Sequence, residues 1–247
     1  MFRLETFRLI KKTFRRFLSL TLIVFIGAGF MMGLLSAPDV LRESVDRYYD
    51  QYNLEDLMIY SPYGFCNEDY LKISKSSGVA SVFASKEIDC HGVHTKGEEN
   101  TYRVSEVSRK NDQFNLIEGR LPQSNNECLF LKNDYLNKYT IGDVITLNMG
   151  EENIGDYLST NKYTICGIVE TPHYMSKVMG ASNYHNEELD CVIFVPNVNF
   201  ISEYYTTMYI TLEGSTDILS NTKAYDRFIE ENRIDIENTT SVQQSYL

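Results

Sequence analysis

The sequence lacks the short motifs by which catalytic and nucleotide-binding sites are commonly recognised. It has no GxSxG, HExxH, P-loop or GxGxxG segment, the patterns that place a nucleophile, a zinc ion or a phosphate. Without a P-loop, this chain is not expected to hydrolyse ATP itself. The paired acids Glu98-Glu99, Glu151-Glu152 and Glu187-Glu188 lie in polar segments and indicate solvated surface rather than acid–base dyads. We therefore predict that the chain is not an enzyme and has no catalytic or cofactor-binding residues.

Basic side chains are scarce outside the N-terminus. Residues 1–16 hold six basic and one acidic side chain, a net charge of +5, whereas the remaining residues hold 17 basic and 33 acidic, a net charge of −16. Nucleic-acid binding needs a basic face that neutralises phosphate, so it is excluded for the acidic body. A basic N-terminal segment followed by an acidic remainder is typical of a membrane protein whose basic end stays in the cytoplasm.

Cysteine and histidine are too sparse to define a metal site. The five cysteines are odd in number, widely spaced and without a CxxC pair, which indicates buried thiols with or without one disulfide. Cys90-His91-Gly92-Val93-His94 is the one cluster that suggests metal, but zinc needs three or four converging ligands. Because His173, His185 and Cys191 lie far along the chain, we predict no metal site and an exposed polar loop instead.

One long uncharged run is present, from Phe17 to Ala37. About 20 apolar residues span the hydrocarbon core of a bilayer, so residues 17–37 predict a transmembrane helix. A cleaved signal peptide is the alternative, but its apolar region is shorter, about 7–15 residues. The one plausible cleavage site, Leu35-Ser36-Ala37, has a bulky residue where a small one is needed and is followed by Pro38. We therefore expect a retained anchor with a cytoplasmic N-terminus and an extracytoplasmic body.

Small residues form a stripe within this run. Gly29 and Gly33 make a GxxxG pattern, and Ala37 lies one turn further on. Small side chains let a second membrane helix approach closely, so these three residues are the predicted helix-packing face. The alternative is that glycine is simply frequent in membrane helices.

Residues 1–16 predict a second, amphipathic helix at the cytoplasmic surface. Phe7, Ile10, Phe14 and Phe17 recur at helical spacing on one side. We expect the aromatic face to lie in the headgroup region and the cations to contact anionic lipid, or simply to set the topology. The predicted membrane-surface cations are Arg8, Lys11, Lys12, Arg15 and Arg16.

The body, residues 38–247, mixes strands and short helices without a regular βαβ rhythm, which favours an α+β fold. Pro38 fits the first turn of a new helix or a kink, and we expect a stalk helix over 39–52. Strands are predicted near Leu57–Tyr60, Val79–Cys90, Thr101–Val107, Glu127–Leu131, Val144–Leu147, Tyr163–Val169, Cys191–Val195 and Met208–Leu212. Further helices are predicted near Glu68–Ser76, Asn133–Tyr139 and Ile218–Ile229.

Several segments, taken in order along the chain, resemble the FtsX/MacB-type permeases of ABC transporters, in particular the large permeases of Gram-positive bacteria. A basic helix precedes the membrane run, and a tyrosine-rich helix follows it. Next come an EGR-x-P-like turn and an acidic residue before a strand. They are followed by a GD-x-I-x-L-like strand, a V-x-G-x-V-x-S-P-x-Y-x-S-like stretch and a strand that ends in proline. These segments are Phe7–Phe17, Ser44–Leu54, Ile117–Pro122, Asn126-Glu127, Ile141–Leu147, Ile165–Ser176 and Phe194–Pro196.

The resemblance implies a MacB-like extracytoplasmic domain. It would comprise a porter-like α+β subdomain over about 53–110 and 200–247, with a β-rich insertion over about 111–199. The implied partners are a cytoplasmic ABC ATPase subunit, further permease helices, the lipid membrane and an extracytoplasmic substrate or partner protein.

The implied function is that of a plasma-membrane permease component that couples the ATPase mechanically to the outer domain. Members of the family have at least four membrane helices, and no second apolar run is found up to Leu247. We therefore expect an N-terminal part, a truncated form or a diverged single-span relative. The alternative function is a single-span sensor or adaptor whose outer domain binds a ligand or protein.

Overall fold

A computed structural model describes most of the chain in two units, residues 1–47 and 48–247, each of which is considered by itself. The described residues are 14–51, 54–97, 99–107, 114–132, 139–174, 181–183, 187–220 and 222–240. The cations Arg8, Lys11 and Lys12, and the predicted amphipathic helix up to residue 13, lie outside them.

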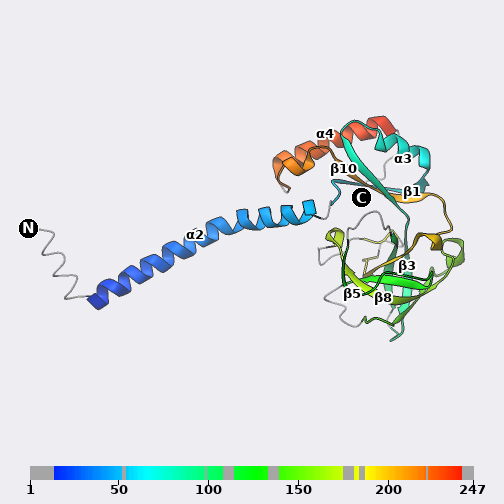
Figure 1. Cartoon of the computed structure of the whole chain (residues 1–247), viewed down its shortest axis with the longest axis horizontal. Coiled ribbons are helices and arrows are strands. Elements are labelled where there is room, and N and C mark those ends of the chain that lie inside the picture. Colours follow the sequence, from blue (N-terminus) through cyan, green and yellow to red (C-terminus); the bar gives the residue numbers. More distant parts are fainter. Residues whose placement is uncertain are drawn as a thin grey trace, which may run out of the picture. The chain divides into compact units, whose positions relative to one another are not determined.

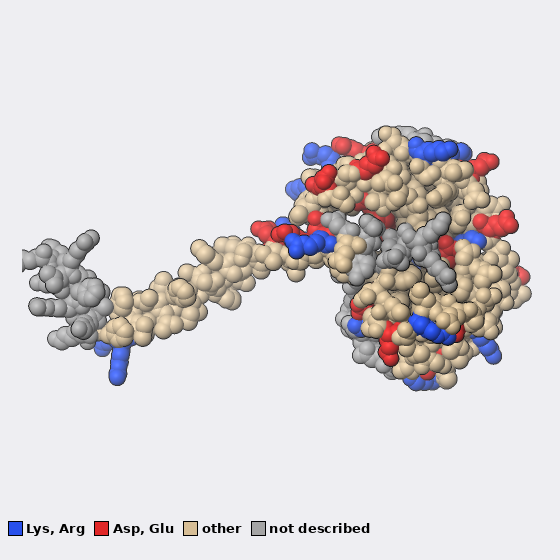
Figure 2. Space-filling view, viewed as in Figure 1, with Lys and Arg blue, Asp and Glu red and all other residues tan. Residues whose placement is uncertain are grey.

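The predicted membrane run lies in one continuous helix, α2, which extends from Phe14 to Gln51. At 1.5 Å per residue such a helix is about 57 Å long, well beyond the roughly 30 Å of a hydrocarbon core. It is long and apolar enough to cross a membrane, and Figure 2 shows its middle free of charged colouring. The helix expected over 39–52 is present up to Gln51, but as the C-terminal part of α2 rather than as a new helix that begins at Pro38. Proline there removes one backbone hydrogen bond without ending the helix.

The outer unit contains two sheets. The smaller has three antiparallel strands in the order β1 (Leu57–Phe65), β10 (Tyr205–Leu212) and β2 (Val79–Ser85). Helices α3 (Asn67–Ser74) and α4 (Lys223–Thr240) lie together over this sheet (Figure 1). Sheet and helices share one apolar core, formed by Phe65, Ile73, Val79, Ala84, Met208, Ile210, Leu212 and Ile236.

The larger sheet has seven strands in the order β5-β8-β6-β9-β4-β3-β7. Because β7 also pairs with β8, the strands from β8 round to β7 close into a barrel, and β5 extends from β8. The strands are β3 (Glu87–His94), β4 (Glu99–Val107), β5 (Asn115–Gly119), β6 (Glu127–Leu131), β7 (Val144–Asn148), β8 (Lys162–Glu170) and β9 (Cys191–Pro196). Four single-turn 3₁₀ helices connect them and flank β10: η1 (Ile154–Asp156), η2 (Pro172–Tyr174), η3 (Asn197–Asn199) and η4 (Ser215–Asp217).

The environment of strand β6 explains why some strand sequences contain an unbroken run of apolar residues. Cys128 and Phe130 belong to the core inside the barrel, whereas Leu129 and Leu131 belong to a second core on the other face. A strand that is buried on both faces needs apolar residues at every position. These observations confirm the α+β class, with a long apolar helix followed by a β-rich domain.

Three sequence expectations need correction. The strand predicted over 79–90 is two strands in different sheets, because the chain leaves the small sheet after Ser85 and joins the barrel at Glu87. The loop predicted over 91–100 is mostly strand, because β3 continues to His94 and only a short turn separates it from β4. In the structure the small sheet's β2 ends at Ser85 and the barrel begins at Glu87, whereas the subdomain boundary was expected near 110.

Other boundaries differ less. Strand β1 passes the predicted stop at Ser61 and reaches Phe65 through a bulge. Strand β5 includes residues 117–119, which were expected to form part of the EGR-like turn. Helix α4 begins at Lys223 rather than Ile218, after the short turn η4. The helix predicted over Asn133–Tyr139 lies outside the described residues except for Tyr139, which is buried and not helical.

Candidate functional site at the junction of the two sheets

The chain crosses from the small sheet to the barrel over a single residue, Lys86. On the small-sheet side, Ser85 pairs with Thr207 of β10. On the barrel side, Glu87 pairs with Ser105 of β4. Side chains from both sheets therefore meet around this crossing, which we call the junction.

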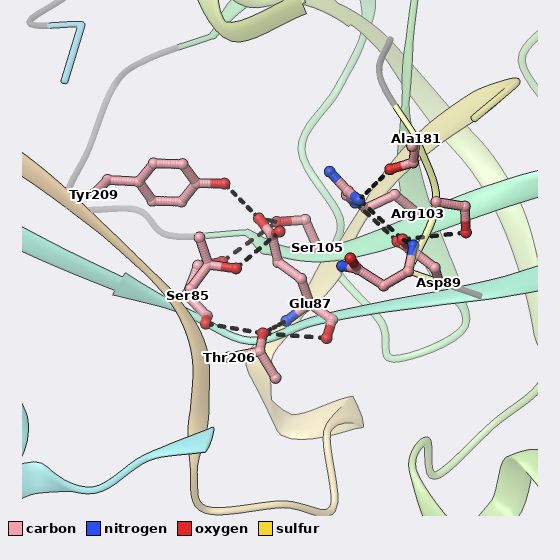
Figure 3. Close-up of polar contacts among 11 residues, drawn as sticks. Ser85, Glu87, Asp89, Arg103, Ser105, Ala181, Thr206 and Tyr209 are labelled. Carbon is pink, nitrogen blue, oxygen red and sulfur yellow. Dashed lines mark hydrogen bonds and ion pairs between the residues drawn. The ribbon is translucent and has the colours of Figure 1, made fainter. Parts of the chain in front are cut away.

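Glu87 is the centre of the junction (Figure 3). Its carboxylate accepts hydrogen bonds from the hydroxyls of Tyr209 (2.6 Å) and Thr207 (3.1 Å) of the small sheet and of Ser105 (3.1 Å) of the barrel. Its backbone N–H donates to Thr206 Oγ1 at 2.7 Å. Hydrogen bonds to a charged acceptor are stronger than neutral ones, so Glu87 is a strong polar tie between the two sheets.

Burial, followed by the nearby charge of Glu87, raises the pKa of Tyr209 well above its ordinary value. Tyr209 therefore keeps its proton and stays a donor to Glu87 throughout the physiological range.

A buried ion pair lies beside Glu87. Arg103 Nε and Nη2 each donate to one carboxylate oxygen of Asp89 at 2.8 Å, and their side chains are 13% and 3% exposed. Asp89 Oδ2 also accepts from the Asn183 backbone at 2.7 Å and from Ser182 Oγ at 3.2 Å. Burial acts to lower the pKa of Arg103, but its hydrogen bonds to Asp89 and the neighbouring charges raise it overall. Arg103 therefore stays charged, and the pair fixes residues 181–183 against the barrel.

A second tie crosses the junction from η2. His173 Nδ1 lies 2.6 Å from Glu55 Oε1, and the His173 ring lies 5.1 Å from the ring of Tyr209. Glu55 directly precedes β1, whereas η2 follows the barrel strand β8. This contact between His173 and Glu55 therefore joins the beginning of the small sheet to the barrel.

Two hollows border the junction. A cavity of about 40 Å³ is lined by Glu87, Glu106, Thr171 and neighbouring side chains. A more open groove of about 220 Å³ is lined by aromatic residues, including Tyr60, Tyr157, Phe200 and Tyr204, with Glu87 and Asp89.

Asp56 ties the start of the small sheet to its end. Its carboxylate accepts from the backbone N–H of Leu212 (2.7 Å) and from the hydroxyl of Tyr225 in α4 (2.6 Å). Leu57 pairs with Ile210, and the Asp56 N–H donates to Ile210 O at 2.9 Å. The segment that enters the small sheet and the segment that leads from it to α4 thus lie side by side.

The predicted helix-packing residues lie on α2. A Cβ placed on Gly27, Gly29 or Gly33 meets nothing within 4 Å. Ala37 and the cations Arg15 and Arg16 are also on α2 and are exposed. The structure of this chain therefore leaves the small-residue face open, and packing against another helix stays a prediction.

The EGR-like turn has a structural explanation. Gly119 has φ +85°, and a Cβ there would lie 2.3 Å from the carbonyl oxygen of Cys166, so glycine is required. Arg120 then donates twice to Glu127, at 2.6 and 2.8 Å. That hydrogen bonding to Arg120, helped by the Gln123 N–H, lowers the pKa of Glu127 to about 2.

The GD-like turn is held in a similar way. Asp143 accepts from the backbone N–H and hydroxyl of Thr140, at 2.9 and 3.0 Å, and Gly142 has φ +96°. His94 Nε2 lies 3.0 Å from Asp143 Oδ2. This motif therefore fixes the beginning of β7 against the turn that follows β3.

The Cys90–His94 cluster does not converge. Cys90 is buried in the barrel core, His91 lies 3.7 Å from Glu187, and His94 contacts Asp143. Within the described ranges, no group of three or more His, Cys, Asp and Glu side chains is arranged to hold a metal ion. His185 lies outside those ranges. All five cysteines are free thiols, and four of them are buried.

No family model matches the sequence, and no curated protein matches it. Solved structures do resemble it. One is the extracellular domain of the noncanonic ABC-type transporter YknZ from Gram-positive bacteria, with 14% identity, 71% of this chain and 92% of that chain covered, and a TM-score of 0.40. Another is the periplasmic region of MacB from Actinobacillus actinomycetemcomitans, with 12% identity, 70% and 74% covered, and a TM-score of 0.37.

A third is a domain of a permease protein from Porphyromonas gingivalis, with 14% identity, 68% of each chain covered and a TM-score of 0.34.

Proposed function

We propose that this chain is the first membrane helix and the outer domain of an ABC transporter permease. In this role it would couple a cytoplasmic ATPase mechanically to the extracytoplasmic domain, for export or for handling of lipids, lipoproteins or peptides. The N-terminus would lie in the cytoplasm, because basic residues gather before the apolar run.

The observation that carries this proposal is the tie at Asp56. A domain inserted between two membrane helices must receive the chain and return it at nearly the same place. Here the entering residue Asp56 is hydrogen-bonded to the last strand residue, Leu212, and to Tyr225 of the departing helix α4. Both connections therefore act on the small sheet, and the barrel is an insertion between β2 and β10.

The path of α2 supports the same role. Its helical hydrogen bonding continues from the apolar run through Pro38 to Gln51. A continuous helix is stiff along its axis, so a displacement of its membrane part would be carried toward its polar end. A flexible linker would lose such a displacement.

The test is affinity purification of the full-length gene product that contains this sequence from its native membranes, in mild detergent. We expect a P-loop ATPase to co-purify, and the reconstituted complex to hydrolyse ATP in a vanadate-sensitive manner. A stable product without any ATPase would contradict the proposal and favour a single-span sensor or adaptor. Protease treatment of intact cells with tags at both ends tests the orientation, and a protected outer domain would contradict it.

A further inference from the structure

Glu106 is a buried carboxyl group at the junction that has no role in the ties described above. It lies near the end of β4 and is 7% exposed. Its backbone N–H donates to the carbonyl oxygen of Lys86, the crossing residue, at 3.2 Å. Its carboxylate accepts from Asn197 Nδ2 at the start of η3. Glu106 therefore contacts both the crossing residue and the connection that leads from β9 to β10.

Glu106 and Glu87 line the same cavity of about 40 Å³. The partners described for both carboxyl groups are neutral, namely the Asn197 amide for Glu106 and three hydroxyls for Glu87. Thr171 also lines this cavity, and its buried Oγ1 makes no hydrogen bond. Two carboxylates that line the same small cavity repel each other when both are ionised.

Other titratable groups around the cavity come from several elements. Lys86 at the crossing attracts the ionised form of Glu106, whereas Glu87 of β3 opposes it. His173 and Tyr174 of η2 and Tyr209 of β10 line the remaining walls. His173 lies 2.6 Å from Glu55, and Tyr209 donates to Glu87.

We propose that Glu106 is a protonation-controlled lock on the junction. With Glu106 protonated, the two sheets are held tightly through Glu87. With Glu106 ionised, its repulsion with Glu87 loosens the contact between the sheets. This property belongs to the outer unit and does not depend on the transport role.

The direction of the pH effect follows from the environment of Glu106. Burial, together with the charge of Glu87, raises its pKa from 4.5 to about 7, against the opposing effects of Lys86 and Asn197. A carboxyl group with a raised pKa in the folded state stabilises the fold fully below its unfolded pKa. That stabilisation is lost as the pH rises through the folded pKa. The junction should therefore be tight at pH 5 and loosened at pH 8.

The first test is thermal unfolding of the full chain in detergent between pH 5 and pH 8. Glu106→Gln mimics the protonated state. We expect wild type to lose Tm relative to Glu106→Gln as the pH rises from the unfolded pKa of 4.5, with the loss complete above the folded pKa of about 7 and a midpoint between the two values. The two proteins should differ least at pH 5. The matched control, Glu118→Gln on the exposed strand β5, should follow wild type. Identical pH profiles for wild type and Glu106→Gln would overturn the proposal.

A second variant keeps the proposal testable if Glu106→Gln folds poorly. Lys86→Met removes the cation that favours ionised Glu106, so the midpoint of the pH dependence should move upward. An unchanged midpoint would contradict the proposal.

The second test is local. At pH 8, amide hydrogen exchange of residues 85–87 and 205–209 should be slower in Glu106→Gln than in wild type by about tenfold or more, given the size of the pKa shift. Exchange in the barrel strands β6 and β8 should change less. Equal exchange at the junction in both proteins would show that Glu106 does not control it.

Discussion

Two of the bidentate arginine–carboxylate pairs in the described part of the outer unit differ sharply in their surroundings. Arg120 and Glu127, at the EGR-like turn, are 47% and 18% exposed. Arg103 and Asp89, at the junction, are 13% and 3% exposed. Water screens an exposed pair, whereas a buried pair that loses one partner leaves an uncompensated charge. The Arg120–Glu127 pair therefore belongs to a recognisable motif but only stabilises a turn. The Arg103–Asp89 pair, which we expect to contribute more to the free energy of unfolding, belongs to no recognisable motif.

The largest effect is expected when the buried pair is broken. Asp89→Ala leaves the buried Arg103 guanidinium without its carboxylate and removes the acceptor for Asn183 and Ser182. We expect a loss of about 3–5 kcal/mol in the free energy of unfolding. Urea unfolding of the full chain in detergent measures it. A loss no larger than that of Glu127→Ala would break the comparison between the two pairs.

The next effect concerns the turn glycine rather than the ion pair beside it. Gly119→Ala combines a positive φ with a Cβ 2.3 Å from the Cys166 carbonyl oxygen, and should cost about 2–3 kcal/mol. Gly142→Ala is the matched control, because Gly142 also has a positive φ but meets nothing within 4 Å. It should cost only about 1 kcal/mol. Equal losses of Tm for the two variants would show that the close approach to Cys166 is unimportant.

A smaller effect tests the central tie at Glu87. Tyr209→Phe removes one charge-assisted hydrogen bond of 2.6 Å and keeps the ring, so we expect a loss of about 2 kcal/mol. Tyr204→Phe, on an exposed tyrosine, should leave stability nearly unchanged. If the two variants unfold at the same urea concentration, Glu87 does not tie the sheets together.

The smallest effect belongs to the exposed pair. Because Arg120 lowers the pKa of Glu127 to about 2, the contribution of Glu127 is present above the unfolded value of 4.5. It is lost as the pH falls toward 2. The Tm of Glu127→Gln should therefore lie slightly below that of wild type at pH 7, and the gap should narrow as the pH falls from 4.5 toward 2. A gap that widens on acidification would contradict this sign.

The sequence predicted the fold where periodicity or turn chemistry was strong. Strands β6 and β9 were found because both faces are buried and each contains an unbroken apolar run, Cys128–Leu131 in β6 and Cys191–Val195 in β9. The GD-like turn was found because glycine and aspartate are needed there, as Gly142 and Asp143 demonstrate. The crossing at Lys86 was missed, because two strands in different sheets follow each other without any turn residue.

The junction residues could not be predicted, because their partners lie far apart in the sequence. Glu87 and Tyr209 are separated by 122 positions, and Asp89 and Asn183 by 94. The available signal was weak: Asp89 and Arg103 are charged residues inside strand segments that hold several other polar side chains as well. Such residues are rarely buried unless they are paired, but nothing in the sequence shows which one pairs with which.

The most direct test of the account concerns the small-residue face of α2. If the helix belongs to a permease, Gly29 and Gly33 must allow close packing with other membrane helices, since packing rather than hydrophobicity drives association in lipid. Gly29→Leu/Gly33→Leu should insert normally but lose most of the co-purifying permease helices and ATPase. The control Gly27→Leu/Met31→Leu places two leucines about 160° round the helix, at equally open positions. It should retain the complex, and equal recovery of partners by both variants would contradict the account.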